Sequence, residues 1–216
     1  MIIDQGIIAG NICNKYETKN PLIRLATNRF LSCAKGLIES HKEQITSVTE
    51  TGCGEGHLSA RISSWGDYTI RACDVSALII DKARQENKNL PVTFYQRSIY
   101  DIDANDAADL MVCCEVLEHL EHPEQALEAL ARTTRRYCLL SVPHEPWWRA
   151  VNMIRGKYLR EFGNTPGHCQ HWGKTSFILL IRNYFDIIAV RAPFPWLMVL
   201  AAKKPSPSSD DPSGAK

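Results

Sequence analysis

The sequence predicts an α/β fold built on a doubly wound, mostly parallel sheet of seven strands. The first reason is that apolar, β-branched segments alternate with segments of helical periodicity from residue 45 onward. The second is a glycine-rich turn, ETGCGEG at Glu50–Gly56, between the first predicted strand and the helix that follows it. The third is the length of 216 residues, of which 44% are hydrophobic and 23% charged, as expected for one globular domain.

An amphipathic helix is expected before the sheet. Pro21 opens the run PLIRLATNRFLSCAKGLIES, in which apolar residues recur at three- to four-residue spacing. Seven runs rich in β-branched and apolar residues are interpreted as strands: Ile45–Thr51, Tyr68–Cys73, Val92–Gln96, Asp109–Cys114, Tyr137–Val142, Phe185–Arg191 and Leu197–Ala202. Helices are expected between the first five strands, near His57–Ser64, Ala77–Asn87 and Pro123–Thr134.

These elements suggest three regions along the chain. Residues 1–44 are expected to form an N-terminal helical cap, and residues 45–203 the α/β core. The core contains an insertion after the fifth strand, residues 143–174, which is rich in Trp, Arg, His and Gly. An insertion of this length is usually functional, so we expect a lid over the acceptor site. Residues 204–216 are polar and rich in Pro and Ser, which predicts disorder.

Composition narrows the classes of function and location. Lys and Arg total 25 against 24 Asp and Glu, a balance that disfavours a nucleic-acid partner. The 8 cysteines include no C-x-x-C pair and mostly lie in apolar runs, which argues against a zinc cluster and for a reducing cytoplasm. The opening MIIDQGIIAG lacks the basic region of a signal peptide, and no run approaches the ~20 apolar residues of a membrane span. Oligomeric state is not indicated.

The glycine turn predicts a ligand site at the end of the first strand. Gly52, Gly54 and Gly56 allow a sharp turn and the close approach of a ligand. Their G-x-G-x-G spacing differs from the dinucleotide fingerprint, and the turn has two glutamates and no Lys or Arg. It therefore suits a cationic ligand better than a pyrophosphate. About 20 residues later, Asp74 ends the second strand, where a carboxylate can accept hydrogen bonds from both hydroxyls of a ribose.

These features resemble those of the class I S-adenosylmethionine-dependent methyltransferases, which have a Rossmann-like fold. The fourth strand ends in DLMVCCEVLEHLEHP, which is similar to the E-V-L-E-H-L-x-x-P segment of the small-molecule branch that includes ubiquinone-biosynthesis O-methyltransferases. The resemblance covers roughly residues 12–202 and implies S-adenosylmethionine as the cofactor. The residues that it assigns to the cofactor site are Tyr16, Glu50, Gly52, Cys53, Gly54, Gly56, Asp74, Val75, Ser98, Ile99 and Glu115. Ser98 stands where the family commonly has an Asp that contacts the adenine amino group.

The Glu-Glu-His pattern after the fourth strand leaves a metal site open. If EVLEHL begins a helical turn, Glu115, Glu118 and His119 face the same direction. Such a mixed oxygen and nitrogen set suits a divalent ion such as Mg²⁺ or Mn²⁺. The pattern resembles the metal-binding set of small-RNA 2′-O-methyltransferases and of some quinone-ring methyltransferases, which take a further His from beyond the fifth strand. His168 or His171 would supply it here.

The reading without a metal carries more weight, and it assigns acid–base roles to the histidines. His119, His144 and His168 are then the candidate general bases, because an imidazole of pKa ~6.5 accepts a proton at neutral pH. We expect methylation of a small, lipophilic or aromatic acceptor on oxygen, in small-molecule biosynthesis. Two alternatives stay open: a metal-dependent RNA-terminal 2′-O-methyltransferase, and a catalytically silent nucleotide-binding or interaction subunit.

The insertion combines aromatic and basic residues. Its apolar face is expected to carry Trp147, Val151, Ile154 and Tyr158. Its local positive charge comes from Arg149, Arg155, Lys157 and Arg160. A segment of this kind covers a lipid-like acceptor or makes peripheral membrane contact through residues 146–160, and a lid packed on the sheet is at least as well supported.

Overall fold

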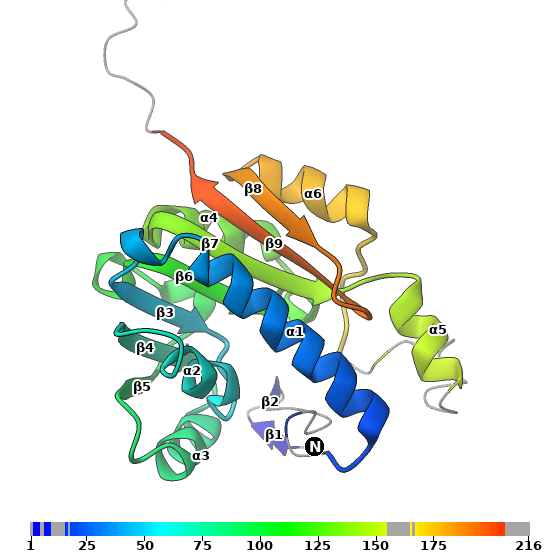
Figure 1. Cartoon of the computed structure of the whole chain (residues 1–216), viewed down its shortest axis with the longest axis horizontal. Helices are drawn as coiled ribbons and strands as arrows, with labels where there is room; N and C mark the ends of the chain where they lie inside the picture. The colour runs from blue at the N-terminus through cyan, green and yellow to red at the C-terminus, as the bar shows by residue number, and fades with distance from the viewer. Residues whose placement is uncertain are drawn as a thin grey trace, which may run out of the picture.

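A computed structural model describes residues 2–4, 7–9, 16, 18–154, 165 and 167–205 of the chain. Its centre is a seven-stranded sheet in the order β5-β4-β3-β6-β7-β9-β8 (Figure 1). The strands are β3 (Ser47–Thr51), β4 (Thr69–Asp74), β5 (Val92–Gln96), β6 (Ala108–Cys114), β7 (Thr134–Pro143), β8 (Phe185–Arg191) and β9 (Trp196–Lys203). The predicted α/β class and the seven predicted strands are confirmed, with small shifts at the strand ends.

The strand order reverses the winding direction of the chain at β3. This strand pairs in parallel with β4 on one side and with β6 on the other, so the chain winds outward from β3 in both directions. β5 and β7 extend the parallel sheet, while β9 runs antiparallel between β7 and β8. In such sheets ligands bind beyond the carboxyl ends of the strands, where the winding direction reverses. The loops after β3, β4 and β6 therefore form the expected site.

Helices cover both faces of the sheet. They are α1 (Pro21–Glu39), α2 (His57–Ile62), α3 (Ala77–Glu86), α4 (Pro123–Thr133), α5 (Trp147–Ile154) and α6 (Lys174–Arg182). Figure 1 shows α1 crossing the front of the sheet and α4 behind it. The sheet has a hydrophobic core on each face, and consecutive residues of β6 point to opposite faces. Leu110 belongs to the core that contains Phe30 of α1, and Met111 belongs to the core that contains Leu127 of α4. Each fully buried side chain of this size stabilises the fold by about 1.5–3 kcal/mol.

Several elements were not predicted. α6 lies between the insertion and β8, and its continuous apolar run Phe177–Ile181 conceals the helical period. β1 (Ile2–Asp4) pairs antiparallel with β2 (Ile7–Ala9), and the described residues contain four 3₁₀ turns in loops. These turns are η1 (Lys42–Gln44), η2 (Ile99–Asp101), η3 (Ala104–Asp106) and η4 (Leu117–His119).

The three predicted regions are described to different extents. The helical part of the 1–44 cap packs on the sheet, where it shares the core with β3 and β9. Within the 143–174 insertion, residues 155–164 and 166 lie outside the described residues, and so do 206–216 of the predicted disordered tail. Lys204, at the start of that tail, donates a hydrogen bond of 3.2 Å to the Asn183 carbonyl. Within the ranges that the structure describes, no helix has the length and apolar character needed to cross a bilayer.

Candidate active site

The glycine turn adopts the backbone that its sequence predicts. Gly52, Gly54 and Gly56 have φ values of 67°, 54° and 79°, in the left-handed region that favours glycine. A Cβ on Gly52 would lie 2.4 Å from the Val116 side chain, whereas a Cβ on Gly54 would meet no atom within 4 Å. Gly52 is therefore required by the protein's own packing. Gly54 borders open space, so its lack of a side chain leaves room for a ligand.

Asp74 ties the end of β4 to this turn. Its Oδ2 accepts a hydrogen bond of 3.0 Å from the Gly54 amide, and its Oδ1 accepts one of 3.0 Å from the Ser76 amide. Burial raises the pKa of the Asp74 carboxyl, and the two amide bonds act in the opposite direction. Because each carboxylate oxygen has two lone pairs, both oxygens retain capacity for ligand hydroxyls. The geometry is compatible with the ribose-binding role expected for Asp74.

The other residues expected at the adenosine side lie just after β4 and β5. Val75 follows β4 with 41% of its surface exposed, which leaves an apolar side chain available for a planar ring. Ser98 caps η2, where its Oγ accepts a hydrogen bond of 3.2 Å from the Tyr100 amide, and Ile99 beside it is buried. Gln96, which sequence reasoning missed, donates from Nε2 to the Val75 carbonyl at 2.9 Å. The sequence signal that could have drawn attention to Gln96 is its position at the end of β5.

Two expected cofactor residues support the turn from within the protein. Glu50 is buried, and its carboxylate accepts a hydrogen bond from the Ser59 hydroxyl of α2. Cys53 is also buried, and its amide donates to the Cys73 carbonyl at 3.0 Å. Burial raises the pKa of the Cys53 thiol well above its usual value, so this thiol stays protonated. These contacts hold the glycine turn against β4 and α2.

Tyr16 approaches the turn from the N-terminal segment. Its ring lies against the imidazole of His57, with 4.8 Å between the ring centroids. His57 is the first residue of α2 and directly follows the last glycine of the turn. Sequence reasoning placed Tyr16 over the cofactor but did not identify His57 as its partner.

The predicted helical face beginning at Glu115 is wrong. Glu115 has φ 60°, a left-handed conformation that a right-handed helix does not use, and the helical turn η4 begins only at Leu117. The Glu115 carboxylate accepts hydrogen bonds from the Ser141 hydroxyl, at 3.2 Å, and from the Trp196 indole. These partners direct it toward β7 and β9, so it does not share a helical face with Glu118 and His119.

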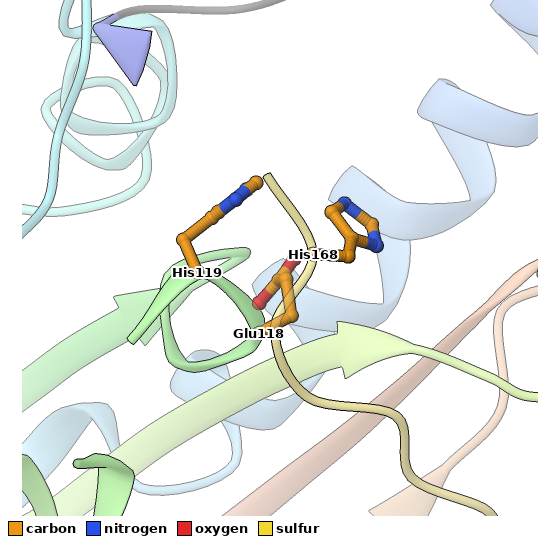
Figure 2. Close-up of side chains that lie close together, drawn as sticks. All are labelled: Glu118, His119 and His168. Atoms are coloured by element: carbon orange, nitrogen blue, oxygen red, sulfur yellow. The ribbon is translucent and has the colours of Figure 1, made fainter. Parts of the chain in front are cut away.

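Glu118, His119 and His168 form a compact group at the end of β6 (Figure 2). One ligating atom from each lies within 4.8 Å of the other two. The His119 Nδ1 donates to the Gly167 carbonyl at 2.9 Å, so Nε2 carries the lone pair of the neutral ring. Loss of solvation among the surrounding protein atoms lowers the pKa of His119, and its hydrogen bond to the Gly167 carbonyl acts in the opposite direction. Burial lowers the pKa of His168 to about 3, with further contributions from His119 and His171. Both imidazoles are therefore neutral at pH 7.

Backbone hydrogen bonds bring His168 to this group from the insertion. The Cys169 and Gln170 amides donate to the Glu118 carbonyl at 2.8 and 3.1 Å. The Gln170 side chain donates to the Leu120 carbonyl at 3.2 Å. The insertion therefore returns to the loop after β6, and residues 48 positions apart meet.

The remaining two candidate histidines lie outside this group. His144 follows β7, where its amide donates to the Pro195 carbonyl at 3.0 Å. His171 is influenced by Arg149 and Glu145: burial and the Arg149 charge lower its pKa, while the Glu145 charge raises it. Of the two histidines considered for a metal set, the geometry favours His168 over His171.

The depressed pKa values of His119, His168 and His171 predict acid sensitivity of the fold. The unfolded chain binds protons at the ordinary pKa near ~6.5, above the folded values, so stability falls as the pH drops below ~6.5. We expect His168→Gln to flatten this dependence in urea unfolding measured at about pH 7 and pH 5. The exposed His122→Gln is the matched control and should retain the wild-type slope. Identical slopes for His168→Gln and wild type would contradict the burial of this imidazole.

Comparisons with known proteins agree with this architecture. A family model described as a methyltransferase domain matches residues 48–136. The ubiquinone biosynthesis O-methyltransferase of Rickettsia typhi is 27% identical over 92 residues, which cover 41% of this chain and 37% of that protein. The chain thus spans less than half of the length of this curated relative.

Two solved structures have the same fold. Magnesium protoporphyrin IX methyltransferase from Synechocystis, with bound S-adenosylhomocysteine, matches with TM-score 0.68 and 17% identity over 87% of this chain and 89% of that one. The methyltransferase domain of a bacterial CtHen1 protein matches with TM-score 0.63 and 20% identity, covering 82% and 99% of the two chains. The family match over residues 48–136, this topology and the glycine turn joined to Asp74 make the chain similar to the class I S-adenosylmethionine-dependent methyltransferases, whose fold it has.

Proposed function

We propose that this protein transfers the methyl group of S-adenosylmethionine to an oxygen atom of a small, lipophilic or aromatic acceptor. The observation that carries the proposal is the shared position of two groups of residues. The glycine turn and Asp74 follow β3 and β4, while Glu118 and His119 follow β6, the neighbour of β3 on its other side. Gly52 lies directly against Val116, so the two loops are in contact. A cofactor on the turn would therefore present its reactive end toward the imidazoles.

The chemistry requires a base and alignment of the two reactants. S-adenosylmethionine supplies an electrophilic methyl group on a sulfonium. The neutral imidazole of His119 takes the proton from the acceptor hydroxyl at Nε2, and His168 beside it is the weaker base because its pKa is about 3. The acceptor oxygen forms the new bond to the methyl carbon, the carbon–sulfur bond breaks, and its electron pair returns to sulfur. In-line positioning of the reactants contributes up to ~7–11 kcal/mol of the barrier reduction.

Aromatic side chains beside the histidines support the proposed class of acceptor. Trp148 lies 6.0 Å from His168 and 5.9 Å from Trp196, measured between ring centroids. Trp147 and Met153 of α5 are 53% and 42% exposed. Apolar and aromatic surfaces near a few polar groups are typical of small-molecule sites. Membrane contact through residues 146–160 stays a prediction, since the second half of that segment lies outside the described residues.

A metal-dependent RNA-terminal 2′-O-methyltransferase is the second candidate. The observation that favours it is the donor set of Glu118, His119 and His168, whose one oxygen and two nitrogens lie within 4.8 Å of one another. This set fits a divalent ion such as Mg²⁺ or Mn²⁺, which would polarise an acceptor hydroxyl. Glu115, the fourth expected ligand, is hydrogen-bonded to Ser141 and Trp196 instead. The near-neutral charge of the chain favours a small acceptor over RNA.

A catalytically silent subunit is the third candidate, and a cytoplasmic location remains an expectation. The open space at Gly54 and the position of Asp74 support cofactor binding rather than a silent role. All seven cysteines in the described residues are free, in keeping with a reducing compartment.

Transfer of a labelled methyl group separates the three candidates. The protein is incubated with methyl-labelled S-adenosylmethionine and with cell extract separated into organic-soluble metabolites, aqueous metabolites and small RNA. We expect label in the organic-soluble pool, and full activity after exhaustive chelation. Label in RNA that is lost on chelation and restored by Mn²⁺ or Mg²⁺ would instead support the second candidate. Absence of label from all three pools, despite binding of S-adenosylhomocysteine, would favour a silent subunit.

A further inference from the structure

We infer that Trp148 is a positioning residue, which holds the imidazole of His168 against Glu118 and His119. The inference rests on the proposed function, because it assigns His168 to the proton-accepting group. Beyond the proposed function, the inference states that Glu118, His119 and His168 come together only when α5 is docked. Trp148 lies in the first turn of α5, and His168 belongs to the segment that returns from the insertion.

Packing, rather than hydrogen bonding, fixes the ring of His168. Within the described part of the chain, its imidazole makes no hydrogen bond, although its amide donates to the Thr165 carbonyl at 3.1 Å. The ring lies edge-on to His119, at 4.8 Å and 81°, and nearly parallel to Trp148, at 6.0 Å and 24°. Figure 2 shows His168 on a segment separate from the loop that carries Glu118 and His119. Its orientation therefore depends on the aromatic ring stacked against it.

Trp148 is itself held from several directions. Its Nε1 donates to the Thr165 hydroxyl at 2.9 Å, and the same oxygen accepts from the Asn152 side chain at 3.1 Å. Asn152 and Thr165 are both buried. The indole also contacts Trp196, whose own indole donates to Glu115. Trp148 is thus oriented by polar and aromatic contacts at once, which a residue that only fills space does not require.

Nuclear magnetic resonance of the histidine rings tests this role without an acceptor. The full chain is labelled at histidine, and cross-relaxation between the His119 and His168 ring protons is recorded with and without S-adenosylhomocysteine. Wild type should show this signal, Trp148→Leu should lose it, and Trp148→Phe should show a weakened signal, because a planar ring is kept but the N–H donor to Thr165 is lost. Trp147→Leu, one residue away on the exposed side of α5, is the matched control and should retain it.

A second variant and the cofactor affinity test the inference if Trp148→Leu does not fold. Thr165→Val keeps the indole but removes its hydrogen-bond acceptor, so it should weaken the signal even if Trp148→Leu does not fold. Cofactor affinity should stay within about twofold of wild type in every folded variant, because the glycine turn is unchanged. A wild-type signal in Trp148→Leu, or in Thr165→Val if the former does not fold, would overturn the inference. If the folded wild-type protein did not bind S-adenosylhomocysteine, the proposed function would be contradicted instead.

Discussion

Replacing Asp74 with alanine is expected to weaken the binding of S-adenosylhomocysteine at least about tenfold. The substitution removes the carboxylate expected to accept both ribose hydroxyls, and charge-assisted hydrogen bonds contribute roughly 1.5–3 kcal/mol. A loss of about 1.4 kcal/mol already corresponds to a tenfold change in affinity. The substitution also leaves the Gly54 and Ser76 amides without their acceptor, which loosens the turn itself. Calorimetric titration measures the affinity directly.

Two further variants separate the binding role of Asp74 from a general loss of stability. Asp67→Ala removes an exposed carboxylate just before the opposite end of β4, and it should bind the cofactor as wild type does. Asp74→Asn keeps one acceptor oxygen and should show an intermediate affinity. Wild-type affinity in Asp74→Ala would show that the cofactor does not lie against the end of β4.

The second large effect is expected from alanine substitutions at Gly54 and Gly52, which should fail in different ways. Gly54→Ala should fold, since its Cβ meets no atom within 4 Å, at a cost of about 1–2 kcal/mol for the left-handed backbone. It should nevertheless lose cofactor binding, because the methyl group enters the space where we expect the ligand. Gly52→Ala places its Cβ 2.4 Å from Val116 and should destabilise the fold by about 2–5 kcal/mol.

Gly36→Ala is the matched control for both variants. Gly36 lies inside α1, where a Cβ would meet no atom within 4 Å, so alanine should stabilise the helix by about 0.5–1 kcal/mol. Urea unfolding and cofactor titration are measured on all three variants. Wild-type cofactor affinity in Gly54→Ala would mean that the open space at Gly54 is not the ligand site.

The sequence predicted the parallel sheet and the glycine turn well because their determinants are local. The glycine spacing specifies a backbone that only glycine adopts easily, and Asp74 follows at the distance that one helix and one strand require. The apolar alternation of the strands likewise reports burial residue by residue. For these reasons the strand positions, α1 and the turn could be predicted without any tertiary information.

The group of Glu118, His119 and His168 could not be predicted as fully, because its contacts join distant segments. Nothing local distinguishes His168 from His171, and the choice depends on how residues 167–170 dock on the loop after β6. The helical interpretation of EVLEHL failed because Glu115 takes a left-handed conformation, held by Ser141 and Trp196 from two other strands. The stacking of Trp148 on His168 has the same origin.

Calorimetric titration of the wild-type chain with S-adenosylhomocysteine tests the central claim most directly. The claim is that the turn after β3 and the carboxylate of Asp74 form a cofactor site that is already assembled in the free protein. We predict saturable binding of one molecule per chain, which the Asp74→Ala variant weakens and the Asp67→Ala variant leaves unchanged. Absence of saturable binding by the folded wild-type chain would contradict the assignment of this protein as a methyl transferase that uses S-adenosylmethionine.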